Sequence, residues 1–162
     1  MKGLRQRSDA LLDLPAPAVK LCILAAGVFF SSGLLTGAWK YWHIARSANA
    51  TSPVYVDIAH RTSLLYSFAA ILLAHFAALS VWSAQTNFIA AAIPLGLFAA
   101  AIGGYILHGS LRDTDDQFLK PHKIAAISLP SWGPGPIIWL LMAGDMGGLA
   151  VGFGVVMMGS EL

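Results

Sequence analysis

Four long apolar runs constrain this chain more than any other feature of its sequence. They cover about residues 19–39, 57–82, 88–108 and 136–158, and each is long enough to cross a bilayer as a helix, which takes ~20 residues. Hydrophobic residues make up 57% of the chain and charged residues only 11%, unlike the composition of a soluble domain. We therefore expect an all-α integral membrane protein, a four-transmembrane-helix bundle that forms one domain over residues 1–162.

The connections between the runs set the order of the bundle. Pro53 cannot lie inside a helix and Asp57 suits a first turn, so the second helix is predicted to begin near Asp57. A loop of about 20 residues precedes it, whereas only the short SAQTN stretch (83–87) joins the second and third helices as a tight antiparallel hairpin. Both longer loops then emerge on the membrane face opposite the termini. Lysines and arginines lie on both faces, so the orientation stays open.

Tryptophans and glycines fall where membrane helices use them. Trp39 and Trp42 close the first run and Trp82 closes the second, as expected of anchors at headgroup level. Gly33 and Gly37 form a small-xxx-small pair, which lets helix backbones approach closely. Similar stripes follow in the later runs: Gly96, Ala100 and Gly103, then Gly144, Gly148 and Gly152. We expect the third and fourth helices to pack along these stripes against the same chain or another copy.

Charge and cysteine content exclude several classes of function. Ten lysines and arginines against eight acidic residues give a net charge of +2 without a dense basic block, so we expect no nucleic-acid partner. Cys22 is the single cysteine, which rules out an intramolecular disulfide and a cysteine-based metal cage. The first apolar run lacks a small-residue cleavage site and is expected to be a retained helix.

Few groups that can ionise lie within the apolar runs, and each is a candidate site. The neutral imidazole of His60 could hold a haem iron, or His60 and Arg61 could simply mark the membrane interface. His75 lies about four turns further on and ~60° round, so it cannot share that iron, and we expect it to be bonded within the bundle. A bis-histidine haem would need His108 or a neighbouring subunit. Asp145 could be a proton relay, a partner of His75, or a protonated packing residue.

The order of motifs resembles that of a family of small membrane isomerases. GLLTG closes the first run, AHRTSLLYSF opens the second, and GGYILHGS closes the third. This order is similar to that of the four-helix styrene oxide isomerases and hydroxylaminobenzene mutases. The resemblance implies a homotrimer with haem b near the subunit boundaries, His60 as the iron ligand, and ferric iron acting as a Lewis acid on an epoxide oxygen. It also implies Tyr105 as a catalytic residue.

One position departs from this family. Both families carry an asparagine six residues after the histidine, where the epoxide isomerase uses it near the substrate, and this chain has Tyr66 there. Tyr66 and Tyr105 are therefore the candidate catalytic residues, although most tyrosines inside membrane helices are packing residues with a bonded hydroxyl. Six residues turn a helix by ~600°, so His60 and Tyr66 project ~120° apart and can face different subunits of a trimer.

Three functions fit these observations. The leading expectation is a haem-b-dependent isomerase of a bacterial inner membrane, which rearranges a small apolar epoxide or related oxygenated compound to a carbonyl product. The second is a non-catalytic membrane haem protein for electron transfer or sensing. The third is a structural or transport protein without haem. The sequence does not identify the substrate.

Overall fold

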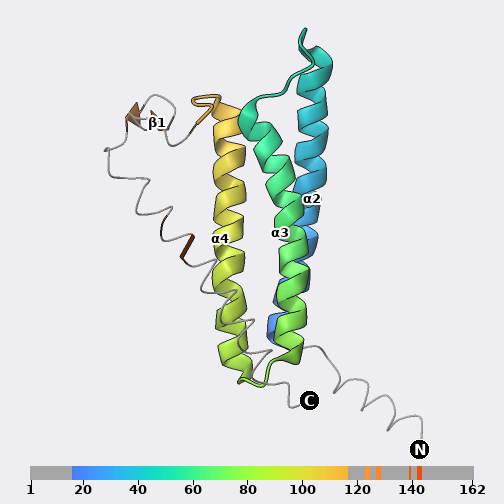
Figure 1. Ribbon diagram of the computed structural model, residues 1–162, viewed down its shortest axis with the longest axis vertical. Coiled ribbons are helices and arrows are strands. Elements are labelled where there is room, and N and C mark those ends of the chain that lie inside the picture. Colours follow the sequence, from blue (N-terminus) through green and yellow to red (C-terminus); the bar gives the residue numbers. More distant parts are fainter. Residues whose placement is uncertain (1–15, 117–122, 125–126, 129–138, 140–141, 144–162) are drawn as a thin grey trace, which may run out of the picture.

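Three long antiparallel helices form the described part of the protein (Figure 1). The computed structural model describes residues 16–116, 123–124, 127–128, 139 and 142–143. The helices are α2 (Pro17–Arg46), α3 (Val54–Leu79) and α4 (Ala84–Leu111). A short antiparallel pair follows, β1 (Lys123–Ile124) with β2 (Ile127–Ser128).

All three helices are long and apolar enough to cross a membrane, which indicates a multi-pass membrane protein. The predicted helical character is thus confirmed for the first three runs, and the short strand pair was not predicted. The fourth run, 136–158, lies outside the described residues except for 139, 142 and 143. The four-helix count therefore stays a prediction.

The helix ends differ from those predicted. Helix α2 continues past Trp39 to Arg46, because the polar residues after Trp39 include no helix breaker and an interfacial turn can stay helical without being apolar. The connection to α3 is therefore 47–53 rather than about 20 residues. Helix α3 begins directly after Pro53, whose carbonyl accepts the N–H groups of Val56 and Asp57 at 3.1 and 3.2 Å. It ends at Leu79, before Trp82.

Side-chain and backbone caps define α4. The Ser83 hydroxyl accepts the N–H of Thr86 at 3.1 Å, which starts the helix at Ala84 rather than at the predicted 88. At the other end Arg112 adopts a left-handed conformation with φ 51° and donates its N–H to the His108 carbonyl at 2.8 Å. This cap ends α4 at Leu111 and turns the chain back toward the bundle.

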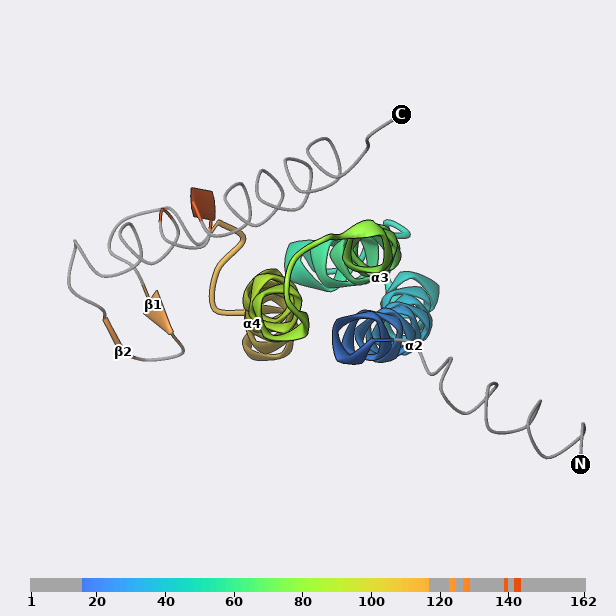
Figure 2. The ribbon, with the colours of Figure 1, turned by 90° about the horizontal axis from the view of Figure 1, so that it is seen from below.

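The topology follows the predicted hairpin order. Figure 1 shows the α2–α3 connection and the end of α4 together at one end of the bundle, and the tight α3–α4 connection at the other. We call the first of these, with residues 46–54 and 111–112, the loop end. Viewed along its length, the bundle has the three helices grouped around a common axis (Figure 2), and each contacts the other two.

Small residues fill much of the core, and large apolar residues face outward. The outward-facing set makes the helices apolar all round, as expected for spans in lipid. It includes Leu24, Leu34, Leu35, Leu65, Phe68 and Ile93. The buried core away from the loop end comprises Ala18, Cys22, Ala26, Phe29, Ala70, Leu73, Ala74, Ala91, Leu95, Phe98 and Ile102. Alanine at so many of these positions lets the helix backbones approach closely.

Glycines of the predicted stripes, and Gly109 outside them, differ in how closely other helices approach them. A Cβ added at Gly33 would lie 2.6 Å from the Leu64 side chain of α3, so this part of α2 packs closely on α3. A Cβ at Gly109 would lie 3.2 Å from the Val56 backbone nitrogen and 3.3 Å from the Trp39 ring, where the three helices meet. At Gly96 and Gly103, by contrast, an added Cβ meets no atom within 4 Å in the described structure.

Candidate functional site

His60 lies in the α2–α3 seam, seated against the Gly33–Gly37 pair. Its Nδ1 atom is 2.8 Å from the Gly33 carbonyl oxygen. A Cβ at position 37 would fall 2.8 Å from the His60 Cε1 atom and 2.9 Å from Nδ1. Glycine at 37 therefore makes the space that the imidazole occupies, and the Gly33 carbonyl fixes how the ring is oriented.

The Gly33 bond also sets the tautomer of the neutral His60 ring. A carbonyl oxygen only accepts hydrogen bonds, so Nδ1 carries the proton and the lone pair lies on Nε2. Ligating histidines in metalloproteins commonly donate their other ring N–H in this way. The Nε2 atom is therefore suited chemically to ligate iron or to accept a proton.

Haem and a bare metal ion require different numbers of ligands from the protein. In the described part of the chain no group of three or more His, Cys, Asp or Glu side chains is placed to hold a metal. A porphyrin brings its own four nitrogens and needs only an axial ligand from the protein. A single histidine with a fixed tautomer meets that need.

An ionic cluster closes the same seam one turn nearer the loop end. Asp57 of α3 pairs with Lys40 of α2, and its other oxygen is 3.5 Å from the Arg61 guanidinium. Lys40 follows Gly37 by three residues and Asp57 precedes His60 by three, so the ion pair lies beside the imidazole. The pair joins the two helices that hold His60, while the Arg61 side chain is 72% exposed and reaches outward.

A second polar row lies in the α3–α4 seam. Tyr105 stacks on the buried Tyr55 ring, with centroids 6.1 Å apart and planes inclined by 18°. Tyr55 also lies 5.3 Å from the His108 ring. His108 Nδ1 is 2.9 Å from Asp113 Oδ1, and both side chains are nearly buried, at 11% and 4% exposed. The Asp113 carboxylate accepts a hydrogen bond from the Nδ1–H group of His108, and this contact fixes the orientation of the imidazole ring.

Tyr66 lies apart from both groups. Its ring stacks on Phe98 of α4, with centroids 4.1 Å apart and planes inclined by 13°. His60 faces α2 and Tyr66 faces α4, in keeping with the ~120° separation computed from helix geometry. The contacts of the described residues thus place His60 in the α2–α3 seam and the two tyrosines, Tyr66 and Tyr105, in the α3–α4 seam.

The remaining ionisable candidates are placed as follows. The side chain of His75 is exposed on α3, and it makes no hydrogen bond to any residue that the structure describes. The predicted bonding of His75 within the bundle is therefore not seen among helices α2 to α4. Asp145, its suggested partner, lies outside the described residues.

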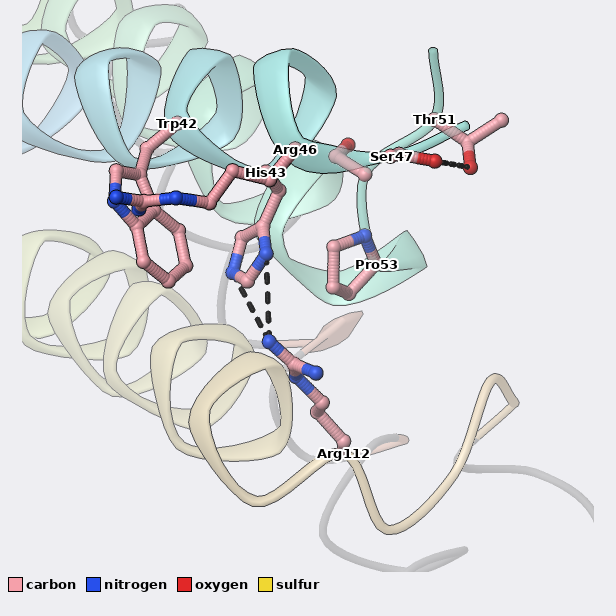
Figure 3. A pocket seen from close by; sticks show the side chains of 8 residues that line it. Trp42, His43, Arg46, Ser47, Thr51, Pro53 and Arg112 are labelled. Carbon is pink, nitrogen blue, oxygen red and sulfur yellow. Dashed lines mark hydrogen bonds between the residues drawn. The ribbon is translucent and has the colours of Figure 1, made fainter. Parts of the chain in front are cut away.

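A third polar group, not predicted from sequence, lines a pocket at the loop end (Figure 3). The pocket has a volume of about 460 Å³. Arg112, from the C-cap of α4, points at His43 of α2, with Nη2 3.3 Å from Nδ1 and 3.5 Å from Nε2. The Arg46 guanidinium lies over the Trp42 ring, 4.2 Å from its centroid. The lining residues are Trp42, His43, Arg46, Ser47, Thr51, Ser52, Pro53 and Arg112.

Sequence reasoning missed this pocket and the Asp113 partner of His108 for one physical reason. Both depend on the left-handed turn at Arg112, which brings residues after α4 back onto the bundle. The only signal in the sequence is the clustering of charged residues at the end of an apolar run. That clustering is equally typical of an ordinary membrane interface.

Comparison with known proteins identifies no relative of this chain. No family model matches it, and neither a curated protein nor a solved structure matches it.

Proposed function

We propose that this chain is a haem-b protein of a bacterial inner membrane, with His60 as the iron ligand, that rearranges a small apolar epoxide to a carbonyl compound. The observation that carries the proposal is the 2.8 Å contact between His60 Nδ1 and the Gly33 carbonyl, which leaves the Nε2 lone pair for a ligand. The order of motifs, similar to that of the membrane epoxide isomerases, supplies the reaction class.

The residues around His60 would hold the imidazole in position for this role. Haem held by His60 would supply Lewis acidity to a substrate oxygen. The Gly33 carbonyl orients the ring through its hydrogen bond to Nδ1–H. The Lys40–Asp57 ion pair joins α2 to α3 beside the ring, so the seam that carries His60 is held at a second point.

Tyr105 is the chain's candidate for stabilising charge on the substrate oxygen. A phenol can donate one hydrogen bond to an oxygen that becomes more negative as a C–O bond breaks. Its stacking on Tyr55 restricts the ring, which is the condition for a positioned donor. Within one chain Tyr105 and Tyr66 lie between α3 and α4, whereas His60 lies between α2 and α3. In the homotrimer that the family resemblance implies, the phenols of one subunit would therefore act on a substrate bound beside His60 of a neighbouring subunit.

A non-catalytic haem protein is the second candidate, and one observation favours it. Tyr66 stacks on Phe98 as a packing residue does, so the side chain at the family's asparagine position is occupied by contacts with α4. A haem protein without a substrate pocket beside the iron would carry electrons or sense a small ligand.

Purification of the full chain in mild detergent, from cells supplied with haem precursor, tests the proposal. We expect the absorption spectrum of a b-type haem, including its Soret band. This spectrum should be lost in His60→Ala and retained in His75→Ala, the matched control on the same helix. A full band in His60→Ala would refute His60 as the ligand.

The catalytic part of the proposal needs a separate test. Haem-loaded protein is expected to turn over at least one member of a panel of aryl and alkyl epoxides. Tyr105→Phe should lower that rate by about 10²–10³, the typical cost of one positioned hydrogen bond to developing charge, and leave the spectrum unchanged. If the haem-loaded protein turns over none of the epoxides in the panel, the non-catalytic alternative is favoured.

A further inference from the structure

The pocket at the loop end has the composition of an anion site. Two guanidiniums, Arg46 from the end of α2 and Arg112 from the cap of α4, border it together with His43 (Figure 3). Three hydroxyl side chains from the α2–α3 connection complete the polar lining: Ser47, Thr51 and Ser52. None of the described lining residues is acidic.

Neither arginine pairs with a carboxylate among the residues that the structure describes. The ion pairs of the described residues join Asp57 to Lys40 and Arg61, and Asp113 to His108, and none includes Arg46 or Arg112. Arg112 is instead directed at a histidine ring, 3.3 Å from Nδ1. A guanidinium that donates to a neutral imidazole keeps its full positive charge, so the described lining of the pocket contributes two positive charges and no negative one.

Arg46 is also held in a defined orientation. Stacking of its guanidinium over the Trp42 ring, 4.2 Å from the centroid, covers one face and leaves the N–H groups at the edge to donate. Arginine forks of this kind match the geometry of phosphate oxygens and bind them through paired hydrogen bonds. A volume of about 460 Å³ exceeds what a bare phosphate needs and lies within the range of small-molecule sites.

We propose that this pocket binds the phosphate group of a ligand, with Arg46 and Arg112 as the paired cationic donors and the connection hydroxyls as neutral donors. The pocket lies at the end of three membrane-spanning helices, beside the exposed Trp42, at the level where lipid headgroups meet the protein. The phosphate can come from an anionic phospholipid headgroup or from a soluble phosphate compound. This site is separate from the proposed haem ligand, since His60 is not among its lining residues.

Two measurements on the full chain distinguish these sources. In the first, inorganic phosphate is titrated into detergent-solubilised protein at low ionic strength and binding is followed by calorimetry. In the second, the thermal unfolding midpoint is compared in nanodiscs of phosphatidylcholine alone and of phosphatidylcholine with phosphatidylglycerol. We expect a positive result in at least one of the two experiments. A higher unfolding midpoint with phosphatidylglycerol, without binding of inorganic phosphate, identifies a lipid headgroup as the ligand. Calorimetric binding of inorganic phosphate identifies a soluble source.

Variants then assign the binding to the pocket. Arg46→Gln and Arg112→Gln should each weaken the affinity for the phosphate ligand by about tenfold or more, because each removes a charge-assisted pair of hydrogen bonds. Arg112→Lys keeps the positive charge but loses the paired N–H donors of the guanidinium, so it should weaken the affinity for the phosphate ligand by a smaller factor. Arg61→Gln, which removes one charge outside the pocket, should change the response by less than about twofold. No response in either arm, or an equal loss in Arg61→Gln, would overturn the proposal.

Discussion

Replacing Gly37 by alanine tests whether the α2–α3 seam is built around the His60 ring. The added Cβ would lie 2.8 Å from Cε1 and 2.9 Å from Nδ1, closer than packed atoms can be. The ring cannot yield freely, because its Nδ1 atom is bonded to the Gly33 carbonyl at 2.8 Å. We therefore expect alanine at 37 to push the imidazole away and break that bond.

The expected cost follows from three terms. Overpacking a close-packed site costs about 1–3 kcal/mol, and a lost hydrogen bond costs about 0.5–1.5 kcal/mol. Replacing glycine by alanine inside a helix returns about 1 kcal/mol. The net destabilisation by Gly37→Ala is thus about 0.5–3.5 kcal/mol on these figures. Gly27→Ala is the matched control on the same helix, because an added Cβ there meets no described atom within 4 Å.

Equilibrium unfolding in mixed micelles, followed by circular dichroism, measures this difference. Gly27→Ala should exceed the stability of the parent by about 1 kcal/mol, so the two variants should differ by about 1.5–4.5 kcal/mol. Gly33→Ala should cost less than Gly37→Ala, because its nearest neighbour is the flexible end of Leu64 at 2.6 Å rather than a tethered ring. Equal stabilities for the position-37 and position-27 variants would refute the reasoning.

Two further predictions concern packing and assembly. The stacking of Tyr66 on Phe98, with centroids 4.1 Å apart, should give a coupling free energy of about 0.5–1.5 kcal/mol in a double-mutant cycle with alanine, and strict additivity would contradict it. Gly103→Leu should dissociate the proposed homotrimer in analytical ultracentrifugation while Gly27→Leu leaves it intact, and an unchanged assembly of Gly103→Leu would show that this face of α4 meets lipid.

Much of the fold could be predicted because a bilayer leaves the backbone few choices. A run of ~20 apolar residues must satisfy its own N–H and C=O groups, which makes it a helix, and a short connection makes neighbouring helices antiparallel. The Gly33–Gly37 pair was recognisable for a similar reason, since small residues mark close helix approach. Helix ends were less predictable: hydropathy falls at Lys40, yet the helical backbone of α2 continues to Arg46.

The polar site was less predictable because its contacts join residues far apart in the chain. His60 could be singled out as a histidine just inside an apolar run, but its Gly33 partner could not. The His43–Arg112 contact spans 69 positions and depends on a left-handed residue at the end of α4. Periodicity and composition describe one segment at a time, so they cannot predict such pairings.

The distribution of polar contacts along the bundle is itself an argument about function. At the loop end each pair of helices carries its own polar group: His60 between α2 and α3, Tyr105 and His108 between α3 and α4, and Arg112 between α2 and α4. The described contacts at the other end are mostly cap and turn bonds around Ser83. Capping satisfies a helix terminus, whereas ordering histidines and charges between helices costs desolvation that bilayer insertion alone does not require. Function is therefore expected at the loop end.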